Sequence, residues 1–300
     1  MALPIEEYRA IDSFGKANDR WIERAAELGE AAVRNALSAG GMAPADIDHI
    51  FFTTVTGIAS PSIDAKLINR LGMRTDIKRT PLFGLGCVGG AAGLARAADY
   101  VRAFPDQVAL LVSVELCSLT LQLKDRSTAN LIASGLFADG AAAAIVTGGR
   151  NPAGPRCPRI VSSQSVFFPD TEEMMGWRMR ETGFEIVLAP GVPHLIRTNL
   201  RVVADEFLAQ NKLSRESIKH WIAHTGGPKV LQAMQEALEL PRCSLAGSWK
   251  SLAAIGNLSS ASVLFVAEDF MQSAKPRSGE YGLLLSMGPG FCGELLLLQW

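Results

Sequence analysis

A cysteine between glycines, Cys87, has the local sequence pattern of an activated nucleophile. It lies in Gly86-Cys87-Val88-Gly89-Gly90, where a strand or tight turn is expected to lead into a helix of small residues. A thiol at a helix N-terminus faces unpaired N–H groups and the positive end of the helix dipole, which favours the thiolate. A thiolate attacks acyl carbonyls readily. The alternative is a small buried cysteine in a glycine-rich packing seam, which is common for free cysteines.

A second stretch, residues 256–264, repeats this pattern with an asparagine in place of the cysteine. Asn257 follows a glycine and precedes a run of small residues, as Cys87 does. It lies 170 residues after Cys87, and Gly57, which ends a strand-like run, has a counterpart 170 residues later at Gly227. The matched offsets predict an internal duplication in which Cys87 and Asn257 occupy equivalent turns.

His224 ends the second strand-like run and lies opposite Thr54 in this register. A histidine and an asparagine can both donate hydrogen bonds to one developing oxyanion. That pairing suits the enolate formed when a malonyl thioester loses carbon dioxide, whose carbanion would attack an acyl group on the cysteine. A cysteine protease uses the same three residue types, but no protease-like signature surrounds Cys87. Taken singly, His224 could be a turn residue and Asn257 a helix cap.

Composition and charge exclude several classes of function. The 300-residue chain has a net charge of −1, which gives no reason to expect nucleic acid or an anionic membrane as a partner. No apolar run is long enough to span a bilayer, and the N-terminus has no signal-peptide pattern. The five cysteines are odd in number and lack C-x-x-C spacing, which argues against a disulfide framework or a zinc site. A reducing cytoplasm is the expected location.

Hydrophobic spacing and glycine positions predict alternating strands and helices in two similar halves. In the first half these are the helices 21–38, 63–71 and 90–102 and the strands 49–56, 108–114 and 141–146, with Asn18 and Asp19 as the expected start of the first helix. In the second half they are the strands 160–168, 184–188 and 281–287 and the helices 193–210, 228–238 and 261–271. A glycine- and proline-rich linker over 148–159 divides the chain into residues 1–150, carrying Cys87, and 151–300, carrying His224 and Asn257. The pattern predicts a five-layered or doubly sandwiched α/β fold.

Four linked motifs resemble those of the type III polyketide synthases, relatives of chalcone synthase. They are Gly86-Cys87-Val88-Gly89-Gly90, His224-Thr225-Gly226-Gly227-Pro228-Lys229, Gly256-Asn257-Leu258-Ser259-Ser260-Ala261-Ser262 and Gly288-Pro289-Gly290. The resemblance runs in order from about residue 20 to the C-terminus. It implies the thiolase-like fold with a duplicated αβαβα core, and a homodimer that acts on coenzyme A thioesters without an acyl carrier protein, a cofactor or a metal. Family members carry a longer N-terminal segment, which includes the first core strand and basic residues that meet coenzyme A phosphates.

The resemblance also assigns roles to residues of this chain. Cys87 would be the acylated nucleophile, and His224 and Asn257 would polarise the malonyl thioester carbonyl and stabilise the enolate. Phe137 matches the gatekeeper between the coenzyme A tunnel and the cavity, and Ile186 falls at the position of a second gatekeeper. The remaining matches are cavity residues, Val55, Ser60, Thr120, Ser259, Gly288, Pro289 and Gly290, and residues toward coenzyme A, Gly227 and Lys229.

Segments 56–64 and 117–122 are similar to bacterial alkylpyrone and alkylresorcinol synthases. This implies an acyltransferase that extends a medium or long fatty acyl-CoA starter with malonyl-CoA and cyclises the product. Thr225 stands where the family usually has proline, and Ala138 replaces the glycine after the gatekeeper. Two alternatives remain: a carrier-protein-dependent ketoacyl synthase III type enzyme, and an inactive, truncated, dimerising homologue. The starter length, the number of condensations and the mode of ring closure stay open.

Overall fold

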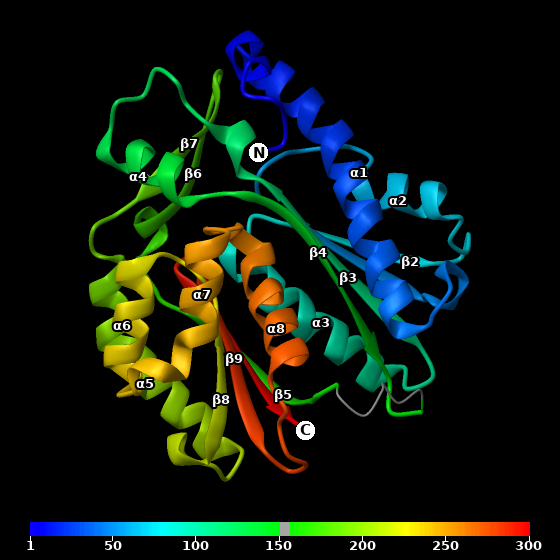
Figure 1. Cartoon of the computed structure of the whole chain (residues 1–300), viewed down its shortest axis with the longest axis vertical. Helices are drawn as coiled ribbons and strands as arrows, with labels where there is room; N and C mark the ends of the chain where they lie inside the picture. Colours follow the sequence, from blue (N-terminus) through cyan, green and yellow to red (C-terminus); the bar gives the residue numbers. More distant parts are fainter. Residues whose placement is uncertain (151–156) are drawn as a thin grey trace.

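Runs of leucine and β-branched residues form a four-stranded sheet in the first half of the chain. The computed structural model describes residues 1–150 and 157–300 (Figure 1). In this sheet the order is β2 (Lys78–Phe83), β1 (His49–Thr54), β3 (Val108–Leu116) and β4 (Asp139–Thr147). β1 is parallel to both β2 and β3, and β4 is antiparallel to β3. β1 and β3 are buried along their whole length, because both faces of the sheet are covered.

The second half builds a sheet with the same central topology. Its order is β5 (Arg159–Phe167), β10 (Cys292–Gln299), β9 (Tyr281–Gly288) and β8 (Ile218–Ala223). β8 is parallel to β9, as β1 is to β3 in the first sheet. β9 is antiparallel to β10, as β3 is to β4. The predicted duplication is therefore confirmed in the fold. The two sheets differ at their edges: β5 flanks β10, whereas no strand of the described residues pairs along the outer edge of β4.

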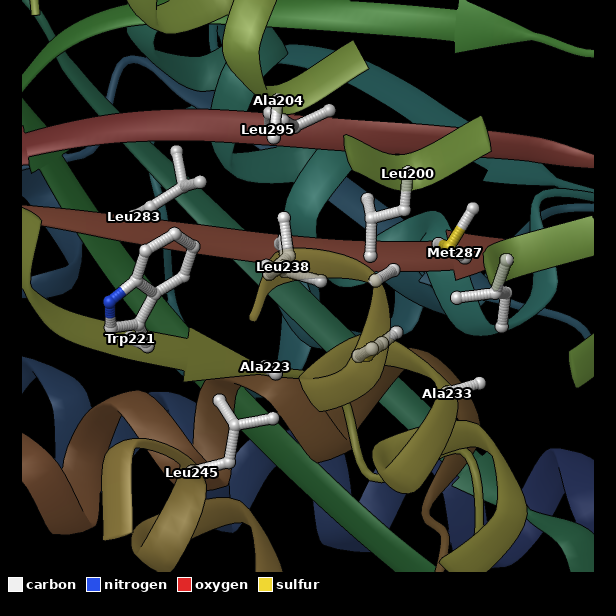
Figure 2. Packing of buried hydrophobic residues seen from close by; sticks show 14 of the residues in the cluster. Leu200, Ala204, Trp221, Ala223, Ala233, Leu238, Leu245, Leu283, Met287 and Leu295 are labelled. Carbon is white, nitrogen blue, oxygen red and sulfur yellow. The ribbon is translucent and has the colours of Figure 1, made fainter. Parts of the chain in front are cut away.

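Helices cover both faces of both sheets, which gives five layers (Figure 1). The outer layer of the first half consists of α1 (Phe14–Gly40) and α2 (Ile63–Leu71). The middle layer, between the two sheets, consists of α3 (Gly89–Ala103) and α8 (Ser262–Ser273). The outer layer of the second half consists of α5 (Val192–Gln210) and α6 (Pro228–Leu238). In Figure 2, Leu200 and Ala204 of α5 and Leu238 of α6 pack with Leu283 and Leu295 of the second sheet. This is the predicted thiolase-like α/β fold.

The small residues of α3 allow this helix to lie between the two sheets. A Cβ atom on Gly93 would fall 2.4 Å from the Leu111 side chain of β3. A Cβ atom on Gly90 would fall 2.1 Å from the backbone oxygen of Ser260, just before α8. A larger residue at position 93 would push α3 off its own sheet, whereas one at position 90 would displace Ser260, so Gly90 keeps the beginnings of α3 and α8 in contact.

Several boundaries differ from those expected from the sequence. α1 begins at Phe14, before the predicted start at Asn18, because the Ser13 side chain caps the helix by accepting a hydrogen bond from the Lys16 backbone N–H. A hairpin of β6 (Met175–Arg180) and β7 (Gly183–Leu188) and two further helices, α4 (Thr128–Leu136) and α7 (Ala246–Ala254), complete the fold. The predicted linker falls partly on residues 151–156, outside the described residues, so the division at 150/151 stays a prediction. Among the helices described, none has the length and apolarity needed to cross a bilayer.

Candidate active site

Cys87 is buried in a short 3-10 turn, Gly86–Val88, that leads directly into α3. Gly86 adopts a φ of 51°, and a Cβ atom there would fall 2.7 Å from the ring of Pro289. The glycine therefore permits both the sharp turn and the close approach of the loop 288–290. Ser286 of β9 donates a hydrogen bond of 2.7 Å to the carbonyl oxygen of Cys87. Strand β9 of the second half thus holds the cysteine turn of the first.

Asn257 occupies the equivalent turn in the second half. It follows Gly256, whose φ is 95°, and its backbone pairs with the chain beside Phe137. The Asn257 N–H donates to the Leu136 oxygen, and the Asn257 oxygen accepts from the Ala138 N–H, each at 2.9 Å. The structure therefore brings the predicted gatekeeper and the predicted oxyanion donor next to one another.

Hydrogen bonds fix the orientation of the Asn257 side chain. Its Oδ1 accepts from the backbone N–H of Ser259 at 2.8 Å and lies 3.3 Å from the hydroxyl of Ser262. Because a backbone N–H can only donate, the atom facing Ser259 must be the amide oxygen. The amide NH2 is the group left to donate elsewhere. It suits an oxygen that gains negative charge.

The Cys87 thiol lies beside the Asn257 loop. Its Sγ is 3.8 Å from the Ser259 hydroxyl, and the Asn257 side chain also forms a hydrogen bond with it. Ser259 is held at a φ of 50°, a left-handed conformation that costs a non-glycine residue about 1–2 kcal/mol. The backbone of this loop is therefore strained, and its hydrogen bonds hold it in the strained conformation, as is common at functional sites.

His224 follows β8. It is held by β9, the strand that also holds the Cys87 turn, and by the loop that contains Asn257. Its backbone N–H donates to the Leu285 oxygen of β9 at 3.0 Å, and the next residue, Thr225, donates to the Gly256 oxygen at 3.4 Å. The imidazole is buried, and neither ring nitrogen has a hydrogen-bond partner among the described residues. Leaving a buried donor and acceptor unpaired costs about 1–3 kcal/mol per group. A substrate oxygen would satisfy the donor.

Burial determines the protonation states of the thiol and the imidazole. Burial raises the pKa of Cys87 to about 12, opposed by hydrogen bonds from Ser259 and Asn257 and reinforced by the charge of Glu115. Burial also lowers the pKa of His224 to about 3. Both groups are thus neutral at pH 7 in the free protein. The expectation that a helix N-terminus would favour the thiolate is not met, because desolvation outweighs the favourable dipole. A neutral imidazole retains one N–H donor.

We expect His224 to make the fold sensitive to acid. The unfolded chain takes up a proton at this residue near the ordinary histidine pKa of 6.5, whereas the folded chain does so only near 3. Stability is therefore fully present above pH 6.5 and declines as the pH falls toward 3. In His224→Gln, the free energy of unfolding should decline less steeply in this range, by about 1.4 kcal/mol per pH unit. Urea unfolding at several pH values measures this slope.

The matched control for this slope is His194→Gln, since His194 is exposed on α5. That variant should keep the acid dependence of the wild type. An unchanged slope in His224→Gln would contradict the burial argument.

The remaining predicted residues divide into buried and exposed groups. Val55, Thr120, Ser259, Gly227 and Gly288 are buried, Phe137, Ile186, Pro289 and Gly290 are partly buried, and Ser60 and Lys229 are exposed. The structure thus joins the Cys87 turn, the Asn257 loop, the His224 loop and the loop 288–290, whereas Ser60 and Lys229 lie on the surface.

Ile186 lines a cavity of about 410 Å³ at the hairpin of β6 and β7. The cavity wall carries three acidic residues, Asp125, Glu173 and Glu185, and one arginine, Arg178, which pairs with Glu173 at 2.7 Å. Glu185 in turn pairs with Arg180 at 3.0 Å, so arginines neutralise two of the three acidic residues.

Sequence reasoning missed one residue close to the cysteine, Glu115. It is a fully buried acidic residue on β3. Burial raises the pKa of its carboxyl group, opposed by hydrogen bonds from Ser260, Val55 and Thr56, and in its ionised form it raises the pKa of the Cys87 thiol. A signal was present in the sequence, because Glu115 is the only charged residue in the otherwise uncharged stretch Val108–Leu116. Charged residues are rarely buried without partners.

Both halves match models of one protein family. Residues 9–152 match the N-terminal domain of chalcone and stilbene synthases, and residues 159–300 match their C-terminal domain. The chain is 51% identical over 301 residues to a 1,3,6,8-tetrahydroxynaphthalene synthase of Streptomyces peucetius subsp. caesius, covering 100% of this chain and 80% of the relative. It is 39% identical to a putative chalcone synthase of Bacillus subtilis, covering 99% of this chain and 84% of the relative.

Solved structures agree with this similarity. The crystal structure of 1,3,6,8-tetrahydroxynaphthalene synthase from Streptomyces coelicolor, a bacterial type III polyketide synthase, superposes with a TM-score of 0.94 at 31% identity. The match covers 99% of this chain and 84% of that one. Germicidin synthase from the same organism, also a type III polyketide synthase, gives a TM-score of 0.89 at 28% identity, covering 100% of this chain and 80% of that one.

Proposed function

Because the chain belongs to the chalcone and stilbene synthase family and is a type III polyketide synthase, we propose that it condenses malonyl-CoA units into a tetrahydroxynaphthalene. The observation that carries this proposal is the 51% identity, over the whole chain, to a synthase of that product. Other relatives of the same name, from Streptomyces coelicolor and Streptomyces griseus, are 32% and 31% identical. The product expected from segments 56–64 and 117–122, an alkylpyrone or alkylresorcinol built on a fatty acyl starter, is the second candidate.

The reaction begins with transfer of an acyl group to Cys87. Its Sγ forms a bond to the thioester carbonyl carbon while the bond from that carbon to the coenzyme A sulfur breaks. The thiol proton ends on the departing coenzyme A, so the step leaves no net charge behind. This balance matters in a site where burial holds Cys87 and His224 neutral.

Decarboxylation of a second malonyl-CoA follows beside His224 and Asn257. The imidazole N–H and the amide NH2 both donate to the thioester carbonyl oxygen. When carbon dioxide leaves, the electron pair of the broken carbon–carbon bond stays on the thioester fragment and delocalises onto that oxygen. The resulting enolate is stabilised by the two donors. The enolate carbon then attacks the acyl carbonyl on Cys87, and the carbon–sulfur bond to the protein breaks. The lengthened chain is now on coenzyme A and can return to the cysteine.

The carbon count of a naphthalene fits malonyl-CoA as the only substrate. Each malonyl-CoA supplies a two-carbon unit after losing carbon dioxide and coenzyme A, so five units give the ten ring carbons. The five ketide oxygens become four hydroxyl groups and one molecule of water. A fatty acyl starter would instead leave an alkyl chain on the product.

The test is a product assay with malonyl-CoA alone and with malonyl-CoA plus lauroyl-CoA. We expect a naphthalene product, identified by mass spectrometry, from malonyl-CoA alone, and no requirement for a second acyl-CoA. Product formation only in the presence of lauroyl-CoA would overturn this assignment in favour of the alkyl-substituted candidate. No product from either mixture would support the inactive homologue. Adding an acyl carrier protein would then test the ketoacyl synthase alternative.

The proposal includes assembly as a homodimer in the cytoplasm, where coenzyme A thioesters are available. The chain's substrates are coenzyme A thioesters, as for type III polyketide synthases generally. Light scattering of the purified protein tests the dimer directly. A monomer that is active in the product assay would contradict it.

A further inference from the structure

Glu115 accepts hydrogen bonds from both halves of the protein. Its Oε2 accepts from the Val55 N–H at 3.1 Å and from the hydroxyls of Thr56 at 2.9 Å and Thr54 at 3.3 Å. Its Oε1 accepts from the N–H of Ser260 at 3.4 Å and from the Ser260 hydroxyl. One oxygen is therefore bound to the turn after β1, and the other to the loop before α8.

The partners of Glu115 are arranged to receive a carboxylate. Two of them are backbone N–H groups, of Val55 and Ser260, which cannot act as acceptors. The Thr56 hydroxyl accepts from the Leu116 N–H at 2.9 Å and so directs its own proton toward Glu115. Burying a carboxylate is costly unless its oxygens are satisfied in this way. A leucine would be the simpler residue here if packing alone were required.

Ser260 connects Glu115 to the catalytic asparagine. It follows Ser259, whose N–H donates to the Asn257 Oδ1 and whose hydroxyl lies 3.8 Å from the Cys87 Sγ. On its other side, the Ser260 backbone oxygen lies against Gly90, where a Cβ atom would come within 2.1 Å. Ser260 is thus fixed between Glu115 and the start of α3, one residue after the Ser259 N–H that holds the Asn257 Oδ1.

We propose that Glu115 is a positioning residue that holds the Ser259–Ser260 segment across the junction of the two halves and thereby orients the Asn257 amide for decarboxylation. This inference rests on the proposed role of Asn257 as an oxyanion donor. Glu115 acts through Ser260 and does not touch the substrate. Its contribution should therefore appear in the decarboxylation step and not in the acylation of Cys87.

The test compares the two half-reactions in Glu115→Gln. A glutamine keeps one acceptor oxygen. Its NH2 group replaces the other oxygen and cannot accept from the N–H and O–H donors there, so the hydrogen bonds to one half of the protein are lost. We expect malonyl-CoA decarboxylation, measured as carbon dioxide release, to slow by about 10- to 100-fold, as for a small misplacement of a catalytic group. Acylation of Cys87, measured by intact-protein mass spectrometry, should not slow relative to the wild type.

A second readout reports whether the Glu115 charge acts on the cysteine. The titratable groups that the Glu115 charge reaches are Cys87 and Cys117, and Asp139 also acts on Cys117. Removing the charge in Glu115→Gln should shift the pH profile of Cys87 alkylation by iodoacetamide to lower pH. Loosened packing that admits water would also shift the profile to lower pH, because burial is the main cause of the raised Cys87 pKa, so the shift supports the positioning role only where acylation is not slowed.

The matched control is Glu294→Gln. Glu294 is a second buried carboxylate, on β10, and accepts from Ser165 at 2.8 Å and from Arg96 at 3.4 Å. That variant should leave both half-reactions and the alkylation profile unchanged. Ser260→Ala, which removes one donor to Glu115 together with the 2.8 Å hydrogen bond to the Ser113 hydroxyl, serves if Glu115→Gln does not fold. We expect it to slow decarboxylation by about 3- to 10-fold.

The outcomes distinguish the two proposals. If the wild type releases no carbon dioxide from malonyl-CoA, the proposed function fails. If Asn257→Ala loses decarboxylation while Glu115→Gln and Ser260→Ala keep it, only the positioning role is overturned. Equal loss of acylation and decarboxylation would also overturn it, because this is the pattern of a structural residue.

Discussion

In Cys87→Ala, no acyl group becomes attached to the protein, and product formation falls by about 10⁴-fold or more. Cys87 lies at the junction of the two halves, with its thiol beside Ser259 and Asn257 and its carbonyl held by Ser286. Alanine keeps the turn and removes only the sulfur, so the loss would reflect chemistry and not folding. Intact-protein mass spectrometry after mixing with malonyl-CoA or lauroyl-CoA measures the adduct. Carbon dioxide release from malonyl-CoA should persist, since His224 and Asn257 remain.

Cys117→Ala is the matched control for this experiment. Cys117 is also buried, and burial raises the pKa of its thiol well above the usual value. Cys117 begins the 3-10 turn Cys117–Thr120 after β3 and does not lie in the turn that leads into α3. It should carry no acyl group, and its variant should load acyl-CoA as the wild type does. An adduct that survives in Cys87→Ala and disappears in Cys117→Ala would show that Cys117, and not Cys87, is the nucleophile.

Replacing Asn257 should have the second largest effect, on decarboxylation. In Asn257→Ala the amide donor is lost, and removal of one oxyanion donor costs about 10²- to 10³-fold in rate. In Asn257→Asp the oxygen that accepts from Ser259 is kept, but a second oxygen replaces the NH2 group. That variant should be at least as slow, because a carboxylate repels the enolate. Carbon dioxide release measures both rates.

Acylation of Cys87 provides the control in the Asn257 variants. Loading requires the thiol and not the enolate donor, so the adduct should still form in both. A fully active Asn257→Asp enzyme would contradict the donor role. Loss of loading together with decarboxylation would indicate that the loop had collapsed.

The sequence alone was sufficient for the features that short segments encode. The turns at Cys87 and Asn257 depend on a preceding glycine and a following small-residue helix, and both are visible in the chain. Their common offset of 170 residues predicted the duplication, which the matched sheet topologies confirm. The burial of β3 likewise followed from its apolar run.

Only the tertiary structure decided the properties that depend on partners distant in the sequence. The neutral states of Cys87 and His224 result from complete burial, which reverses the thiolate expectation drawn from the local helix. The role of Glu115 depends on Ser260, 145 residues away, which no local pattern could indicate. Local spacing sets the backbone turns, because they involve neighbouring residues. Desolvation and hydrogen bonding across the two halves set the chemistry, because those interactions exist only after the sheets have packed on α3 and α8.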